Sequence, residues 1–229
     1  MGDRYTPNCV EGGEPFYQFL SDMREFRRRR GKGPFAPHPR FRFCTSYLKM
    51  RVGRAYAHTR FRDGYKSLIG LRADEPHRVA GLRNHTRFFP EEEAVAPLAE
   101  SDITKADVLR FWSEQSFDLN LREWEGNCTK CFLKSEALLS DAFAEYPEDN
   151  EIWLRMEREF GTFGDKSYAR IHAETPVRRE IIRPAVRAGT EPECPEGFDR
   201  KRFRLIFLQE RRRLRSQEET ISCQCEAAG

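Results

Sequence analysis

The residues with the clearest chemical potential are two cysteines, Cys128 and Cys131, in the segment GNCTKCFLKS. Two thiolates at this spacing in a turn can bind one metal ion or one iron–sulfur cluster. The same spacing also serves thiol–disulfide chemistry, although there it usually opens a helix after a strand. A third interpretation is a pair of half-buried free thiols. The pair alone leaves these alternatives open.

Other cysteines add candidates at a distance along the chain. Cys44 stands among Arg40, Arg42, Lys49 and Arg51, and positive neighbours favour a thiolate. Because 84 residues separate Cys44 from Cys128, only the fold could bring them together. The C-terminal cysteines are interpreted as free thiols of a frayed tail, as a swinging redox arm or as a source of a fourth cluster ligand. They are Cys223 and Cys225.

A second candidate site follows a short apolar run. Residues 66–71 (KSLIGL) predict a buried strand, and Gly70, Arg72, Asp74 and Glu75 fall in the loop at its carboxyl end. In open α/β sheets ligands bind at such ends. Arginine can hold a phosphate or sulfate with two hydrogen bonds. The alternative is a surface turn closed by a salt bridge.

The elements that would position these residues are mostly helical. Apolar spacing predicts a helix over 16–30, and further helices begin near Thr45 or Ser46 and near Ser101 or Asp102. Pro147 separates two more helices. From about residue 175 the prolines predict an irregular segment, followed by a last amphipathic helix in RKRFRLIFLQERRRLRSQEE.

Composition narrows the class of protein. The chain has 229 residues, 38% hydrophobic, and a formal charge of +3, which is far from that of a dedicated nucleic-acid binder. It has no apolar run long enough to cross a membrane and no apolar signal-peptide core, so we expect a reducing, cytoplasmic setting without membrane partners or a disulfide framework. The run Arg27–Arg30 is either a solvated face or a contact for phosphates. The five histidines form no zinc-hydrolase motif.

Four segments resemble one family in order and spacing. The segments RFCTSYLK, LIGLRADEPHR, PLAESDITKADVLRFW and EGNCTKCFLKS are similar to the phosphoadenosine phosphosulfate reductase family of the adenine nucleotide alpha-hydrolase superfamily, in its phage and bacterial reductase-like branch. The resemblance covers about residues 35–175. It implies a truncated parallel α/β sheet with flanking helices and a helical C-terminal region. The implied divisions are 1–34 (helix and basic linker), 35–175 (reductase-like core) and 176–229 (irregular tail with a terminal helix).

The resemblance also implies roles for individual residues. A [4Fe–4S] cluster would be held by cysteines, with Thr45 in place of a second adjacent cysteine. The C-terminal thiolate would be the nucleophile, as an analogy to the reductases. No flavin or NAD motif is present. The implied cluster ligands are Cys44, Cys128, Cys131 and Cys225, the catalytic candidates are Cys223 and Cys225, and the substrate-binding candidates are Arg42, Lys49, Gly70, Arg72 and Glu75.

One feature of the superfamily is missing. Its nucleotide loop, Ser-Gly-Gly-x-Asp-Ser, has no counterpart, since Gly12-Gly13 follows no predicted strand and lacks the Asp-Ser. We therefore expect a truncated or misassigned start, or a subunit that supplies the loop. The leading prediction is a reductase acting on an adenylylated or phosphoadenylylated sulfate with a thiol electron donor, or a variant that inserts sulfur into nucleic acid. The alternative is a non-catalytic, cluster-bearing module that binds nucleic acid or protein.

Overall fold

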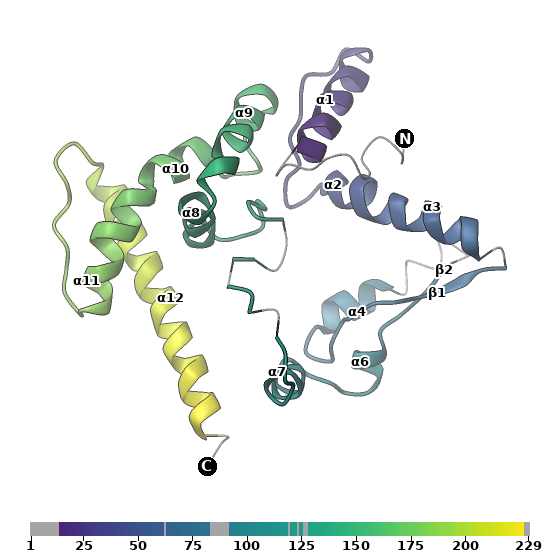
Figure 1. Cartoon of the computed structure of the whole chain (residues 1–229). Helices are drawn as coiled ribbons and strands as arrows, with labels where there is room; N and C mark the ends of the chain where they lie inside the picture. The colour runs from purple at the N-terminus through teal and green to yellow at the C-terminus, as the bar shows by residue number, and fades with distance from the viewer. Residues whose placement is uncertain are drawn as a thin grey trace. The chain divides into compact units, whose positions relative to one another are not determined.

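The computed structural model describes residues 14–61, 63–82, 92–118, 120–122, 124–125 and 128–226, without the side chains of 14, 15 and 217–226. It has a mixed α/β fold that is mostly helical, with a small parallel sheet (Figure 1). The predicted α/β class is confirmed at this level. Among the described residues no helix is long and apolar enough to span a membrane.

The described chain forms two compact units. One contains the residues up to Phe43 and from Leu121 onward, here called the helical unit. The other, Cys44–Asn120, contains the two strands and is called the sheet unit. The predicted core region 35–175 therefore includes residues of both units.

The sheet unit is built around two short parallel strands. β1 (Tyr65–Leu68) pairs with β2 (Glu92–Val95), with Leu68 opposite Val95. The intervening chain contains α4 (Pro76–Leu82). The prediction of a fully buried strand is wrong, because β1 alternates between half-buried and exposed positions and Leu68 is 73% exposed. A two-sided buried strand needs neighbours that cover both faces.

Helices precede and follow this sheet. The helix predicted near Thr45 begins earlier, because α2 (Phe43–Thr45) runs through a π-helical turn (Ser46–Met50) into α3 (Arg51–Arg60). After β2 come α6 (Pro97–Glu100) and α7 (Lys105–Ser113).

The predicted start of α7 at Ser101 or Asp102 is wrong. Thr104 caps the helix by accepting from the Asp107 backbone N–H, and the Asp107 carboxylate accepts from the Thr104 N–H. This reciprocal capping satisfies two backbone donors at once, whereas Asp102 adopts a positive φ of 56° in the preceding turn.

The helical unit packs short helices around aromatic rings. The predicted N-terminal helix is α1 (Glu14–Arg28), which buries Phe19 and Leu20. As predicted, Pro147 separates two helices, α8 and α9. The helices α10, α11 and α12 follow in the C-terminal region. The helices are α8 (Glu136–Glu145), α9 (Asn150–Phe160), α10 (Tyr168–Pro176), α11 (Arg183–Arg187) and α12 (Arg200–Glu226).

An aromatic cluster forms the centre of the helical unit. Phe163 and Tyr168 are fully buried, with their ring centroids 4.7 Å apart. Phe163 also stacks on Phe132, which follows the cysteine pair. Trp153 of α9 contacts both Phe163 and Tyr168. Phe132, the residue after Cys131, is therefore part of the core and anchors the chain around Cys131.

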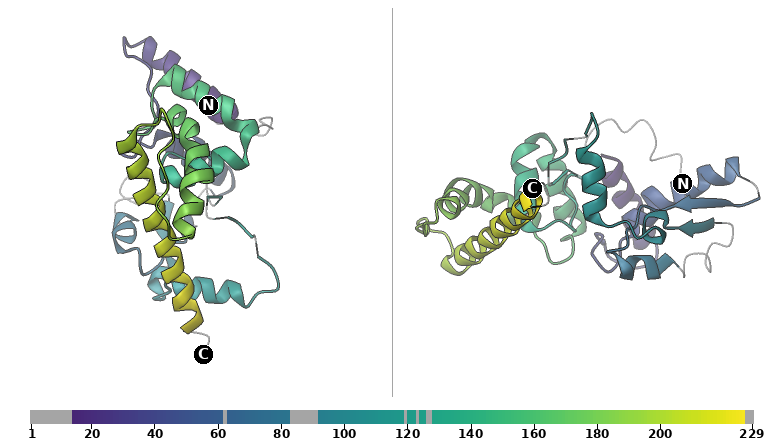
Figure 2. Two further views of the ribbon diagram at one scale, coloured as in Figure 1. Left: turned by 90° about the vertical axis from the view of Figure 1, so that its left-hand side faces the viewer. Right: turned by 90° about the horizontal axis from the view of Figure 1, so that it is seen from below.

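The predicted irregular segment from residue 176 is partly wrong. The helix of α10 continues through a π-helical turn, Val177–Ile182, into α11. Pro184 lies just after the π-helical turn in this continuous helical path, and the buried Ile182 packs on Phe203 and Ile206 of α12. α11 and α12 consequently lie side by side (Figures 1 and 2).

Candidate functional site

The cysteine pair occupies a tight turn in the helical unit, here called the cysteine turn, Cys128–Cys131. The backbone N–H of Cys131 donates to the Cys128 carbonyl over 3.1 Å, and the Lys134 N–H donates to the Cys131 carbonyl over 2.9 Å. Cys128 is exposed and Cys131 is half-buried, and both are free thiols. The turn therefore presents one open and one partly sheltered sulfur.

Hydrogen bonds from side chains fasten the backbone of this turn and of the residues that follow it. Lys134 Nζ donates to the Cys128 carbonyl over 2.7 Å. Lys166 Nζ donates to the carbonyls of Phe132 and Lys134 over 2.6 and 2.8 Å. The Tyr168 hydroxyl donates to the carbonyl of Lys130. Side chains from elsewhere in the sequence thus hold the turn in one conformation.

Lys134 places positive charge beside the sulfurs, whereas the charge of Lys130 faces other groups. Burial lowers the pKa of Lys134, and the negative charge of Cys131 and Cys128 opposes that shift. Lys130 is fully buried between the cysteines in sequence and donates to the Tyr146 carbonyl over 2.9 Å. Burial lowers the pKa of Lys130 to about 8, with Asp149 and Glu148 opposing. The ammonium group of Lys134, which interacts with both thiols, is the one that favours thiolates.

The donor set of the turn suits a thiolate-bound metal or cluster in part. Cys128 and Cys131 supply two sulfurs, whereas iron–sulfur clusters use about four thiolates. Cys44 lies in α2 of the sheet unit. Cys225 and Cys223 lie in the last turns of α12, outside the described side chains. Within the described residues no group of three metal-binding side chains converges.

The second candidate site, the strand-end loop Gly70–Glu75, lies where both strands of the sheet unit end. The Ile69 N–H donates to the Val95 carbonyl over 2.8 Å and extends the ladder. The Leu71 carbonyl accepts from Ala99, and the Ala73 N–H donates to the Ile103 carbonyl over 2.9 Å. The loop therefore meets the chain that leads into α7. This is the edge at which parallel sheets bind ligands.

Charges within this loop are already paired. Arg72 Nε donates to Asp74 Oδ1 over 2.9 Å, and Arg72 Nη1 lies 3.4 Å from Glu75 Oε2. The hydrogen bond from Arg72 lowers the pKa of Asp74, and a bond from the backbone N–H of Lys105 adds to this effect. The Asp74 carboxylate thus occupies both the guanidinium of Arg72 and the first residue of α7. An anionic ligand would have to displace Asp74.

The other predicted substrate-binding residues are spread over both units. Gly70 is exposed, and a Cβ added to it would meet nothing within 4 Å. Glu75 is half-buried, and the hydrogen bond from Arg78 lowers its pKa. Lys49 is exposed in the sheet unit, whereas the exposed Arg42 belongs to the helical unit. The structure brings Gly70, Arg72 and Glu75 together in one loop.

Sequence reasoning missed the residues that fasten or block these sites. The sequence shows Lys130 between the two cysteines and Lys134 three positions after the second one. Lys166 and Tyr168 carry no local signal, because they reach the turn from more than 30 positions away. The sequence places Asp74 in the strand-end loop, but its contact with the start of α7 depends on how the loop packs.

Comparison with known proteins adds one relative. The chain is 35% identical over 143 residues to the uncharacterized nin region protein ORF290 of Escherichia phage lambda. The match covers 61% of this chain and 43% of the relative, so the chain matches less than half of that protein's length. No family model matches the chain, and no solved structure matches it.

Proposed function

We propose that this protein is a phosphoadenosine phosphosulfate reductase-like protein that binds an adenylylated sulfate or a related adenine nucleotide and holds an iron–sulfur cluster. The observation that carries the proposal is the cysteine turn. Its two thiols stand next to Lys134, and its backbone is fastened by Lys166 and Tyr168. A turn held in this way presents two sulfurs at a constant separation, as a cluster or metal requires.

The proposed ligands in the helical unit are Cys128 and Cys131, with Cys225 as the further one. Cys44 belongs to the sheet unit, and its part in the cluster stays a prediction from the sequence. A bound cluster would supply electrostatic tuning. The protein's own contribution at this site is positive charge from Lys134, which offsets the negative charge of thiolate ligands. The strand-end loop would bind the nucleotide's phosphate or sulfate end through Arg72 after Asp74 has been displaced.

The proposed chemistry uses the C-terminal thiols. With Cys225 as a cluster ligand, the Cys223 thiolate attacks the sulfur of the adenylylated sulfate, so an S–S bond forms while the S–O bond to the nucleotide phosphate breaks and the nucleotide leaves. A second thiol, from an external thiol donor, attacks Cys223 Sγ. This step releases sulfite and leaves a disulfide, so the two thiols provide both electrons.

Anaerobic purification with iron and sulfide quantification tests the cluster. We expect stoichiometric iron and absorbance at the short-wavelength end of the visible spectrum in the wild type, and loss of both in Cys128→Ser and Cys131→Ser. Cys194→Ser is the matched control, because Cys194 is a half-buried thiol of the same unit whose Sγ lies 3.6 Å from the Phe198 carbonyl. A colourless, iron-free wild type with native helix content would refute the cluster.

The pairing of Arg72 favours a second candidate, a binding module that does not turn over a nucleotide. Because Asp74 occupies both Arg72 and the start of α7, the loop as it stands offers no open anion site among its described residues. The two candidates differ in nucleotide affinity. Calorimetry with adenosine 3′,5′-bisphosphate distinguishes them: the reductase-like function predicts binding that Arg72→Gln weakens, and the module predicts none.

A further inference from the structure

The outer side of α12 carries a dense group of cations. Helical geometry places residues four and eleven positions apart on nearly the same side. One row contains Arg200, Arg204, Arg211 and Arg215, all of them exposed. Lys201 and Arg212, also exposed, extend the row sideways. These six residues, called the α12 cationic face, extend over about 22 Å of helix. They are Arg200, Lys201, Arg204, Arg211, Arg212 and Arg215.

On the opposite side of the same helix, the cations point inward and pair with carboxylates. Arg202 donates to Glu136 and Glu174 over 2.6 Å each. Arg213 lies 2.8 Å from Asp141. On the α12 cationic face, by contrast, no described carboxylate forms an ion pair. Like charges four positions apart repel one another, so this face gains from an external anion.

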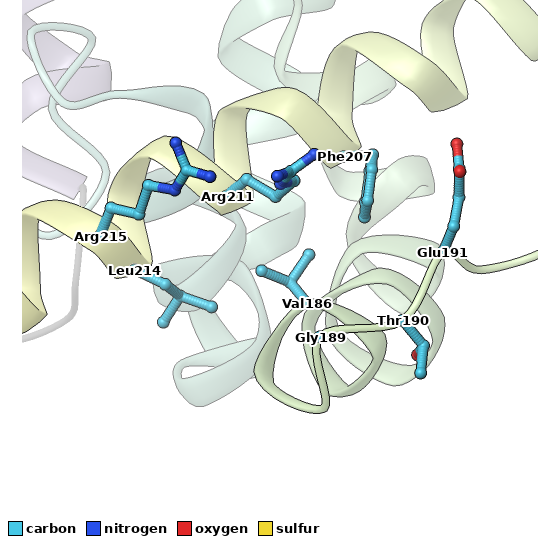
Figure 3. Close-up of a pocket in the computed structure, with 8 residues that line it drawn as sticks. All are labelled: Val186, Gly189, Thr190, Glu191, Phe207, Arg211, Leu214 and Arg215. Carbon is cyan, nitrogen blue, oxygen red and sulfur yellow. The ribbon is translucent and has the colours of Figure 1, made fainter.

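A groove follows part of this face. Arg211 and Arg215 line one section together with Phe207, and Figure 3 shows these side chains on the same helix. Arg200 and Arg204 line the adjoining section, which shares Phe207. The connector after α11 forms the other wall and carries Glu191 and Glu193. The negative charges of Glu191 and Glu193 repel an anion from their side of the groove. An anion would therefore bind along the cations of α12.

The chemistry of the face selects its partner. Five of its six cations are arginines, which bind phosphate oxygens with paired hydrogen bonds. An extended row matches a polymer that carries a charge at every step, as nucleic acids do. A membrane-binding helix needs a broad exposed apolar side. Phe203, Ile206 and Phe207 of α12 are buried, and Leu205 and Leu208 are exposed but stand among the cations of this face.

We propose that the α12 cationic face binds the phosphate backbone of a nucleic acid. The contact is with phosphates and is therefore independent of base sequence. This surface shares no residue with the cysteine turn or with the strand-end loop. It would bring nucleic acid to the protein whether or not a cluster or nucleotide is bound.

Fluorescence anisotropy with the full chain and short labelled single-stranded and duplex DNA tests the proposal. Four to six phosphate contacts predict that affinity falls by roughly 100-fold or more between about 50 and 200 mM salt. The test variant replaces four arginines by glutamine and should weaken binding at least about tenfold and reduce the salt dependence. Its substitutions are Arg200→Gln, Arg204→Gln, Arg211→Gln and Arg215→Gln.

A control variant loses the same net charge elsewhere. Its four arginines are exposed but paired with carboxylates, so binding should be nearly unchanged. Equal losses in the two variants would overturn the proposal in favour of net charge alone. Absence of DNA binding, with binding to phosphatidylserine vesicles instead, would overturn it in favour of a membrane surface. The control substitutions are Arg110→Gln, Arg122→Gln, Arg155→Gln and Arg158→Gln.

Discussion

The attachment of α12 to the helical unit depends on a buried carboxylate, and its removal gives a measurable prediction. Glu210 is fully buried and accepts hydrogen bonds from Arg178 Nη1 over 2.8 Å and from Arg183 Nε over 3.0 Å. Arg178 is itself buried, and burial lowers its pKa while the hydrogen bond with Glu210 opposes that shift. Glu210→Leu would leave two guanidinium groups in the interior without this partner.

The size of the effect follows from the partners that remain. Removing one member of a buried ion pair costs about 3–5 kcal/mol of unfolding free energy. Arg183 keeps a 2.6 Å bond to Asp141, and Arg178 keeps a 2.8 Å bond to Gln209. These bonds place the cost near the lower limit, about 3 kcal/mol, which lowers Tm by roughly 6–12 °C in a protein of this size.

Urea and thermal unfolding followed by circular dichroism measure this change. Glu151→Leu is the control, because Glu151 is 76% exposed and its pair with Arg158 should contribute less than about 1 kcal/mol. The reasoning is refuted if Glu210→Leu is no less stable than Glu151→Leu. A smaller loss in the double variant Arg178→Met with Glu210→Leu than in Glu210→Leu alone would identify the unpaired charge as the cause.

Two further predictions concern the candidate sites. Gly70→Ala should keep or slightly raise the unfolding free energy, because the added Cβ meets open space, yet weaken adenine-nucleotide binding in calorimetry; unchanged affinity would mean that no ligand approaches Gly70. Lys130 has a pKa of about 8 in the folded protein against an ordinary value of 10.5, so the unfolded chain binds more protons between these values. Stability should therefore rise with pH across this window, by up to about 3 kcal/mol, and Lys130→Met should abolish that rise in urea unfolding; an equal rise in the variant would contradict the assignment.

Several elements were predictable because their signals are local. The apolar spacing of residues 16–30 predicts α1, and Pro147 marks the break between α8 and α9. The start of α7 was misplaced because Ser101 and Asp102 are also good capping residues. The competition was decided by Thr104 and Asp107, whose side chains and backbone donors cap each other. When neighbouring residues are equally good capping residues, only the three-dimensional structure shows which of them caps the helix.

The continuation of the helix beyond residue 176 shows the opposite case. Prolines at 176 and 184 predict irregular chain, but burial of Arg178 and Ile182 against α12 stabilises a helical path through a π-helical turn. Tertiary contacts outweighed local propensity there. The contact partners lie about 30 residues further along the chain, where no local pattern reveals them.

The sequence by itself determined the types and spacings of chemical groups: a cysteine pair suited to a turn, an arginine loop after a strand, and a basic amphipathic terminal helix. Only the tertiary structure decided how these groups are used. Lys166 and Tyr168 fasten the cysteine turn, Asp74 occupies Arg72, and α12 turns one set of arginines inward to carboxylates while the other stays exposed. The reason is that spacing along the chain decides which residues share a face, whereas the partner of that face depends on which elements pack together.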